Sequence, residues 1–367
     1  MKFKIYRLIL AIIISVMTFK AFALENIILP PGFVIEEYAD VPNARSLVIG
    51  ENGTIFASNR SGDSIFAVVL ENNIAKTITL DDGLSTPNGI AFHDGDLYVA
   101  EIDKIYRYDD IESNLYNVPE PITLDIDLPS ESWHGWRYIS FGPDNKLYIS
   151  IGAPCNICEE QGYANIVRMN PDGSDREIYA TGIRNSVGFT WHPVTKELWF
   201  TDNGRDMLGD NLPPCELNRA EVKGLNFGFP YCHAGEILDP IFGKGKNCSD
   251  YRAPIQKLGP HVAPLGLTFY YGDMFPSEYK GQIFIAEHGS WNRSKKIGYR
   301  ISLVKLDKEV AISYEPFATG WLQNDYGLDT VSGRPVDLVV LDDGSMLVSD
   351  DHAGKIYRIS YSASTST

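Results

Sequence analysis

Basic residues and a histidine recur in this sequence at the borders of short apolar segments. His134 and Arg137 precede one such segment, Arg184 and Asn185 precede another, and Arg334 precedes a third. Guanidinium groups bind carboxylates and phosphates through charge-assisted hydrogen bonds, so several of them at one place favour an anionic ligand. These residues predict a binding site for an anion, with His134 as a candidate functional residue within it.

The apolar segments belong to a pattern that occurs six times: a turn, a run of aliphatic and aromatic residues, and a small residue. The runs are Ile55–Ser58, Leu97–Ala100, Leu147–Ser150, Leu198–Thr201, Ile283–Ala286 and Met346–Ser349. An inner strand is expected before each run, beginning at Arg45, Asn88, Arg137, Asn185, Leu265 and Arg334. Repeats of several strands at spacings of about 40–50 residues are typical of propellers. We therefore predict an all-β fold, a six-bladed β-propeller with about four strands in each blade.

Two further segments complete the predicted propeller. Leu29–Ala39 alternates like a strand and has no local partner, so we expect it to be the outer strand of the last blade, beside Lys355–Tyr361. This pairing would close the ring and leave neither end of the chain as a free edge. The long interval before the fifth repeat predicts one enlarged blade, which contains Met207–Asn218 and the loop from Cys232 to Cys248.

The predicted blades gather the polar residues at one end of the propeller. If the hairpin turns lie at one end, the other end collects Arg45, Asn59, Arg60, Asn88, Glu101, His134, Arg137, Arg184, Asn185, Asp202, Asn203, Glu287, His288, Arg293, Arg334, Asp350, Asp351 and His352. So many cations on one rim of an acidic protein predict a funnel for a polyanionic ligand. Alternatively, Arg45, Arg137 and Arg334 recur at one blade position because they donate to carbonyl oxygens near the channel.

Charge and length exclude several classes of protein. The 367 residues include 32 Lys and Arg against 48 Asp and Glu, a formal net charge of −16. This balance argues against nucleic acid or an anionic membrane as a partner. No Pro/Ser-rich linker or block of charge divides the chain. We expect residues 24–367 to form a single domain.

The first 23 residues have the pattern of a signal peptide. Its parts are the basic residues Lys2, Lys4 and Arg7, the apolar run 8–17 and the end Ala21-Phe22-Ala23. The apolar run is shorter than the roughly 20 residues that a stable membrane span needs. We expect a periplasmic or secreted protein with no stable membrane span. A retained N-terminal anchor is the alternative.

Five cysteines in an exported chain indicate disulfides with one thiol left over. Cys155 and Cys158 resemble a redox or metal pair, but no second pair with zinc spacing exists, and a local structural disulfide is the simpler interpretation. Cys232 and Cys248 bracket a loop that a disulfide would close. Cys215 is then predicted to be free.

Seven segments carry a resemblance to a known family: Pro30–Phe33 with Asn43-Ala44-Arg45, His134–Ser150, Tyr179–Asn185, Thr201–Asp206, Pro213–Asn218, Phe229–His233 and Ala286–Arg293. They resemble the sugar dehydrogenases that depend on pyrroloquinoline quinone (PQQ). The motifs are most similar to those of the L-sorbosone dehydrogenase-like branch and less similar to those of soluble glucose dehydrogenase. The resemblance covers nearly the whole of residues 24–367.

The resemblance implies a quinoprotein that oxidises aldose sugars or related aldehydes with PQQ and Ca²⁺. His134 matches the general base, which takes a proton from the sugar hydroxyl. Arg184 and Asn185 match the residues that face the quinone oxygen and stabilise charge as hydride arrives. The electron acceptor, a cytochrome, a quinone or a dye, stays open.

The resemblance also assigns binding roles. PQQ carries three carboxylates, and hard oxygen ligands suit Ca²⁺. The matched cofactor-binding residues are Arg137, Asn185, Arg293, Lys295 and Arg334, and the matched calcium ligands are the backbone carbonyls of Gly204 and Arg205.

The chain departs from the family pattern at two positions. Relatives of the glucose type have an Asp that orients the catalytic His, where this chain has Ala153. His134 then has no assigned partner unless Glu101 or Glu131 substitutes. Cys215 stands where Asp is common. These departures favour a lower turnover or a different substrate.

Two other functions fit a six-bladed propeller, because fold does not determine function. A metal-dependent lactonase or hydrolase would need a cage of carboxylates in the channel rather than an arginine-rich rim. A non-enzymatic binding propeller would have a rim without clusters of histidine and cations. The sequence contains no Gly-Xaa-Ser-Xaa-Gly elbow, and no spacing joins its histidines into a metal triad.

Overall fold

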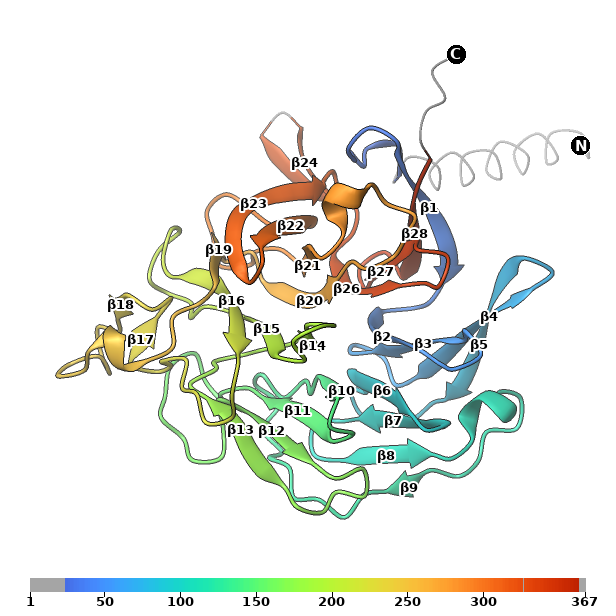
Figure 1. Cartoon of the computed structure of the whole chain (residues 1–367), viewed down its shortest axis with the longest axis horizontal. Helices are drawn as coiled ribbons and strands as arrows, with labels where there is room; N and C mark the ends of the chain where they lie inside the picture. Colours follow the sequence, from blue (N-terminus) through green and yellow to red (C-terminus); the bar gives the residue numbers. More distant parts are fainter. Residues whose placement is uncertain (1–23, 326, 363–367) are drawn as a thin grey trace, which may run out of the picture.

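Six antiparallel sheets surround a central axis in the computed structural model, which describes residues 24–325 and 327–362 (Figure 1). Each sheet has four strands, and successive sheets follow one another around the ring. The predicted six-bladed β-propeller is confirmed. The predicted signal peptide, residues 1–23, lies outside the described residues. In the described part of the chain, no helix has the length and apolar character needed to cross a bilayer.

The first three blades are built from consecutive strands. Blade 1 contains β2 (Ala44–Ile49), β3 (Ile55–Asn59), β4 (Ile65–Glu71) and β5 (Ile74–Asp81). Blade 2 contains β6 (Gly89–His93), β7 (Asp96–Ala100), β8 (Ile105–Tyr108) and β9 (Ile122–Thr123). Blade 3 contains β10 (Ile139–Phe141), β11 (Leu147–Ile151), β12 (Asn165–Met169) and β13 (Glu177–Thr181).

The last three blades include the insertions. Blade 4 contains β14 (Phe189–Trp191), β15 (Leu198–Asp202), β16 (Pro214–Ala220) and β19 (Gln256–Pro260). Blade 5 contains β20 (Pro264–Phe269), β21 (Ile283–Glu287), β22 (Arg300–Asp307) and β23 (Val310–Ala318). Blade 6 contains β26 (Pro335–Val340), β27 (Met346–Asp350), β28 (Lys355–Tyr361) and β1 (Phe33–Asp40).

The remaining elements are short and lie between blade strands. They are the hairpins β17 (Cys232–His233) with β18 (Ile237–Leu238) and β24 (Leu322–Asp325) with β25 (Leu328–Val331), and the 3₁₀ helices η1 (Ile111–Ser113), η2 (Cys248–Asp250) and η3 (Ser277–Tyr279). The β17–β18 hairpin and η2 lie within the enlarged fourth blade that the sequence predicts. In Figure 1 this insertion projects from the ring beside β16.

The N-terminal strand closes the ring, as predicted. β1 pairs antiparallel with β28, from Phe33 opposite Tyr361 to Asp40 opposite Lys355. The last blade therefore combines the two ends of the described chain (Figure 1). Because this pairing covers the outer edge of β28, opening the ring would expose both a sheet edge and the apolar contacts between blades 1 and 6.

The small residue at the end of a second strand joins neighbouring blades. The hydroxyl of Ser58 donates to the carbonyl of Asn88 in the next blade at 2.6 Å. Ser349 of the last blade donates in the same way to the carbonyl of Arg45 in the first, at 2.5 Å. Inner strands of adjacent blades do not share a ladder, so these hydroxyls satisfy backbone groups that would otherwise be buried without a partner. This explains why the aliphatic–aromatic run ends in a small, often hydroxylated, residue.

Two inner strands begin later than the sequence suggested. β10 begins at Ile139 and β14 at Phe189, whereas strands were expected from Arg137 and Asn185. In the fourth blade the reason is a side chain: the backbone N–H groups of Arg184 and Asn185 donate to the two carboxylate oxygens of Asp202, at 2.8 and 2.6 Å. These N–H groups are therefore not available to a ladder.

Both predicted disulfides are present. Cys155 is bonded to Cys158, and Cys232 is bonded to Cys248. Cys215 is free and buried, as expected. The first bridge closes a tight loop directly after blade 3's second strand, and the second closes the insertion of blade 4.

Phe33 provides a test of ring closure. Its ring packs edge-on against Phe275, Tyr279 and Phe317 of blade 5, with ring centroids 4.8–5.2 Å apart. Phe33→Ala should lower the free energy of unfolding by about 3–5 kcal/mol because it removes a buried aromatic ring. Denaturant titration measures this. The neighbouring Val34 is 53% exposed, so Val34→Ala should cost about 0.5 kcal/mol or less. Equal losses in the two variants would contradict the closure role.

Candidate active site: an arginine-rich pocket at one end of the channel

A pocket of about 500 Å³ opens where the inner strands begin and the second strands end. This volume lies in the range of small-molecule sites. Four arginines line it, together with the single carboxylate that the described residues contribute to the lining: Arg45, Arg60, Arg184, Arg334 and Asp206. The predicted cationic rim is therefore a cavity wall with a large excess of positive charge.

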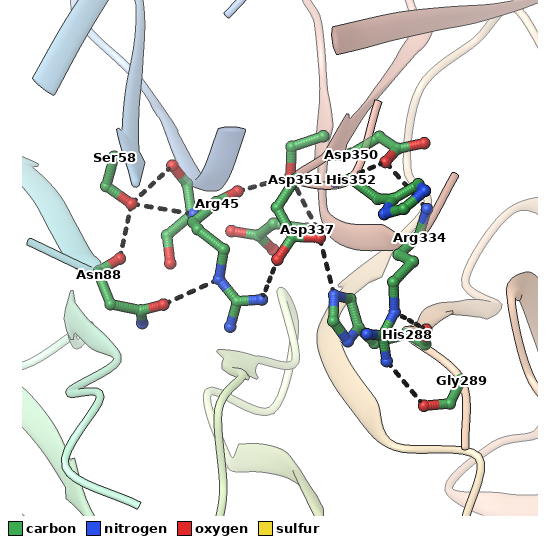
Figure 2. A network of polar contacts seen from close by, with 12 residues as sticks. Arg45, Ser58, Asn88, His288, Gly289, Arg334, Asp337, Asp350, Asp351 and His352 are labelled. Carbon is green, nitrogen blue, oxygen red and sulfur yellow. Dashed lines mark hydrogen bonds and ion pairs between the residues drawn. The ribbon is translucent and has the colours of Figure 1, made fainter. Parts of the chain in front are cut away.

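Arg45 joins three blades at the pocket wall (Figure 2). Its guanidinium forms an ion pair with Asp351 of blade 6 at 2.9 Å and donates to Asn88 of blade 2 at 3.0 Å. Asp351 also contacts Nε2 of His288 from blade 5 at 2.8 Å. Burial by itself raises the pKa of Asp351, but the hydrogen bond from His288 and the charge of Arg45 outweigh it and hold the pKa well below its usual range. Burial lowers the pKa of His288 to about 4.

Arg334 donates to backbone carbonyls and also lines the pocket. It donates to the carbonyl oxygens of His288 and Gly289, at 2.9 and 3.0 Å (Figure 2). Its guanidinium carbon lies 5.4 Å from the ring centre of Tyr299. The alternative that this arginine serves backbone carbonyls therefore describes part of its contacts, while its side chain also lines the pocket.

Arg60 differs from the other three pocket arginines. It has no hydrogen bond or ion pair to another described residue, and its guanidinium lies over the ring of Trp136 at 4.0 Å. Burial and the charges of Arg45 and Arg334 lower its pKa to about 10. A half-buried, unpaired guanidinium that repels its neighbours gains from an anion in the cavity. Arg60 was placed on the rim by its position after β3, but nothing in the sequence marked it as a ligand.

His134 is held by the backbone of the residue that replaces the expected Asp. Its Nδ1 lies 2.8 Å from the carbonyl oxygen of Ala153, so Nδ1 carries the proton and Nε2 has the free lone pair. The indole N–H of Trp133 donates to Nε2 at 3.2 Å. Burial and the charge of Arg184 lower the pKa of His134 to about 3, so the imidazole is neutral at physiological pH.

Neither carboxylate suggested as a partner for His134 reaches it. Glu101 accepts the backbone N–H of Ser85 at 2.5 Å, and Glu131 contacts the hydroxyl of Tyr163. The substitution at position 153 leaves a carbonyl oxygen as the orienting acceptor. A carbonyl fixes the same tautomer as a carboxylate would, but without its negative charge.

Arg184 is fully engaged with the protein. Its Nε donates to the carbonyl of Asn156 at 2.9 Å, and its two terminal nitrogens donate to the Asn156 side chain, the carbonyls of Asn203 and Gly204, and the Asp206 carboxylate at 3.0–3.2 Å. These five bonds use all five guanidinium N–H groups. Arg184 therefore contributes positive charge to the pocket floor, while the side chain of Asn185 lines the cavity beside it.

The carbonyls expected to hold calcium give a mixed result. Gly204 lines the pocket, but its carbonyl oxygen already accepts an N–H from the Arg184 cation. The Arg205 side chain points to a buried ion pair with Asp239. Among the described residues no group of three or more His, Cys, Asp or Glu side chains is placed to hold a metal. The carbonyl oxygen of Gly204 is a suitable donor in its chemistry but faces the Arg184 cation, so it does not fit Ca²⁺ in this arrangement.

Three of the predicted cofactor ligands lie outside the pocket lining. Arg137 is buried and donates to the carbonyls of Ile102 and Pro129, at 2.8 and 2.6 Å. Arg293 contacts the loop at Asp210 and Asn211, and Lys295 is exposed. The two arginines donate to acceptors nearby, and neither of them lines the cavity.

Comparisons relate the chain to known proteins. The family profile described as Glucose / Sorbosone dehydrogenase matches residues 127–291, and a profile described as TrAA12-like matches residues 242–362. An uncharacterized protein of Borreliella burgdorferi is 37% identical over 357 residues and covers 90% of both chains. Residues 127–291 therefore match the glucose/sorbosone dehydrogenase family model.

Two further relatives carry informative descriptions. The PQQ-dependent pyranose dehydrogenase of Coprinopsis cinerea is 32% identical over 233 residues, which is 50% of this chain and 31% of that enzyme. The calcium structure of a Trichoderma reesei protein of Carbohydrate-Active Enzymes Family AA12 superimposes with a TM-score of 0.80 at 20% identity, covering 92% of this chain and 97% of that one. At this identity the superposition supports the shared propeller fold.

The reactivity of the free thiol of Cys215 tests its burial in the pocket wall. Cys215 lines the cavity, and burial raises the pKa of its thiol to about 11. The thiolate is the reactive form, so folded protein at pH 8 should react with an aromatic disulfide reagent far more slowly than a small thiol does. After unfolding without reductant, one thiol per chain should react. Three or five thiols would contradict the disulfide assignment.

Proposed function

We propose that the protein is an exported PQQ-dependent dehydrogenase that oxidises aldose sugars or related aldehydes. The observation that carries this proposal is the composition of one cavity: three arginines from blades 1 and 6 on one side, and a neutral histidine beside a buried guanidinium on the other. A ligand that fills it has anionic groups at one end and reacts at the other. The match to the family model supports this reading.

The arginines at blades 1 and 6 would hold the carboxylates of PQQ. Arg60 has an unpaired guanidinium, and Arg45 and Arg334 lie close enough to lower its pKa. When bound, PQQ supplies an ortho-quinone that accepts two electrons from the substrate. The chain's contribution there is to bind and orient, with the positive charge of Arg184 favouring negative charge that develops nearby.

His134 would be the general base. Its Nε2 lone pair is free of a proton, and Nδ1–H is fixed by the Ala153 carbonyl. To accept a proton from a sugar hydroxyl, Nε2 must lose the hydrogen bond from Trp133, which is 54% exposed and has room to turn outward. Trp291, 68% exposed, lies on the same pocket lining and offers a second aromatic face for a sugar ring.

Export and calcium binding, two further parts of the proposal, differ in their support. Export to the periplasm or the medium agrees with the two disulfides, since these form in oxidising compartments. Calcium was expected from the resemblance, and binding it would require Arg184 to release the Gly204 carbonyl. The lactonase alternative gains nothing from the cavity, whose lining includes one carboxylate among the described residues.

Cofactor binding is the first test. Titration of the purified protein with PQQ, followed by quenching of tryptophan fluorescence, should show saturable binding. Arg60→Ala and Arg334→Ala should each weaken it about 10- to 150-fold, since a charge-assisted hydrogen bond contributes roughly 1.5–3 kcal/mol. Lys295→Ala, an exposed cation outside the lining, is the matched control and should bind normally. No binding by the unmodified protein, with or without Ca²⁺, would refute the dehydrogenase proposal.

The second test concerns the base. His134→Ala should slow reduction of bound PQQ by sugar about 10²- to 10⁴-fold and leave PQQ affinity near normal, because the arginines remain. Rapid-mixing absorbance measures both.

The same experiment gives a pH dependence with a defined sign. A base works in its neutral form, which exists above its pKa, and the pKa of His134 is lowered to about 3. The rate should therefore show no loss from His134 protonation between pH 8 and pH 5. A loss centred near pH 6.5 that disappears in His134→Ala would show that the site does not lower this pKa.

A further inference from the structure

One short loop contacts both candidate catalytic side chains. The segment Ala153–Cys158 begins two residues after the last residue of β11, Ile151. At its start, the Ala153 carbonyl accepts Nδ1 of His134 at 2.8 Å, and the Ala153 N–H donates to the carbonyl of Arg184 at 2.8 Å. Ala153 alone therefore contacts both the His134 imidazole and the backbone of Arg184.

Asn156, in the middle of this loop, holds the Arg184 side chain. Its backbone carbonyl accepts Nε of Arg184 at 2.9 Å, and its side-chain oxygen accepts a terminal nitrogen at 3.0 Å. The same side chain forms a two-way pair with the backbone of Asp206: it accepts the Asp206 N–H at 2.8 Å and donates to the Asp206 carbonyl at 3.0 Å. One amide thus connects the loop, the guanidinium and the pocket segment after β15.

The Cys155–Cys158 disulfide closes the loop around Asn156. Without it, the six residues from Ala153 to Cys158 would have to hold two carbonyls and an amide at defined positions in water. Asn156 is only half-buried, and the described residues place no apolar cluster on the loop. A covalent closure restricts these conformations before any ligand binds.

We propose that the disulfide-closed loop Ala153–Cys158 is a positioning element of the active site, with Asn156 as the positioning residue for Arg184 and the Ala153 carbonyl for His134. The loop takes over the orienting role that the missing carboxylate at position 153 would have, and extends it to the arginine. This inference rests on the proposed function for its effect on PQQ, but the geometry that it asserts has a separate readout.

The decisive variant is Cys155→Ala/Cys158→Ala. It should weaken PQQ binding and slow PQQ reduction by about 10- to 100-fold in total, because small misplacement of reacting groups has effects of this size. Asn156→Ala removes one of the two contacts and should show part of this effect, and the triple variant should be no worse than Cys155→Ala/Cys158→Ala, since Asn156 acts through the same loop. Asn156→Asp keeps an acceptor for Arg184 and should recover part of the loss. Ile157→Ala, in the same loop but without these contacts, is the control.

A second disulfide separates positioning from general stability. Cys232→Ala/Cys248→Ala opens a loop with a sequence separation of 16 instead of 3, so in the chain-entropy model it should cost more stability. If the Cys155–Cys158 bridge only stabilised the fold, the Cys232–Cys248 variant would show the larger loss of PQQ binding. We expect Cys155→Ala/Cys158→Ala to lose more PQQ affinity, and Cys232→Ala/Cys248→Ala to lose more thermal stability.

The Trp133 indole N–H resonance gives the readout that does not depend on PQQ. This N–H donates to Nε2 of His134, so it reports where the imidazole lies; Trp133→Phe assigns it, and the buried Trp321 serves as reference. The resonance should shift or broaden in Cys155→Ala/Cys158→Ala and stay in place in Cys232→Ala/Cys248→Ala. If the unmodified protein fails to bind PQQ, the proposed function falls and this resonance alone decides the inference. An unchanged resonance together with unchanged PQQ affinity would overturn it.

Discussion

The pairing of β1 with β28 is the constraint on which the pocket depends. It brings blade 6 against blade 1, and three contacts across this junction then form: the Ser349 hydroxyl with the Arg45 carbonyl, the Leu47 N–H with the Asp337 carboxylate, and the Arg45–Asp351 ion pair. Figure 2 shows Arg45, Asp337 and Asp351 near one another, with His288 of blade 5 and Arg334 of blade 6 beside them. Because a buried ion pair gains little by itself, its main effect here is to fix where the arginines lie.

Buried carboxylates do much of the structural work near the axis. Asp202 and Asp337 each accept two backbone N–H groups from inner strands or from the segments that precede them. Burial raises the pKa of Asp337 to about 7, and burial with the adjacent Glu216 raises the pKa of Asp202 to about 8. The raised pKa values shift these carboxyl groups toward their neutral forms, so they cancel less of the positive charge in the cavity. The protein as a whole is acidic, yet the cavity stays cationic and attracts anions.

The four pocket arginines divide into engaged and available groups. Arg184 uses every N–H on protein acceptors, and Arg334 and Arg45 each use part of theirs. Arg60 rests on an aromatic face and keeps its donors for a ligand. The positive charge of Arg184 therefore serves mainly to hold the cavity wall in place, whereas that of Arg60 remains available to an anionic ligand. It also explains why a substitution at Arg184 and one at Arg60 need not have the same effect on affinity.

The sequence by itself determined the number of blades, the closing strand, both disulfides and the end of the propeller at which several arginines line one cavity. These follow from local patterns: alternating apolar residues, turns, and the small residue after each run, whose positions repeat because every blade solves the same packing problem. The tertiary structure decided which rim cations face the cavity. Arg137 and Arg293 find carbonyl acceptors nearby and turn away, whereas Arg60 finds an indole ring. It also decided that the backbone carbonyl of Ala153 orients His134. Every residue has a backbone carbonyl, so the residue type at position 153 could not predict this contact. Side-chain direction depends on partners from other blades, and those partners are set only when the ring closes.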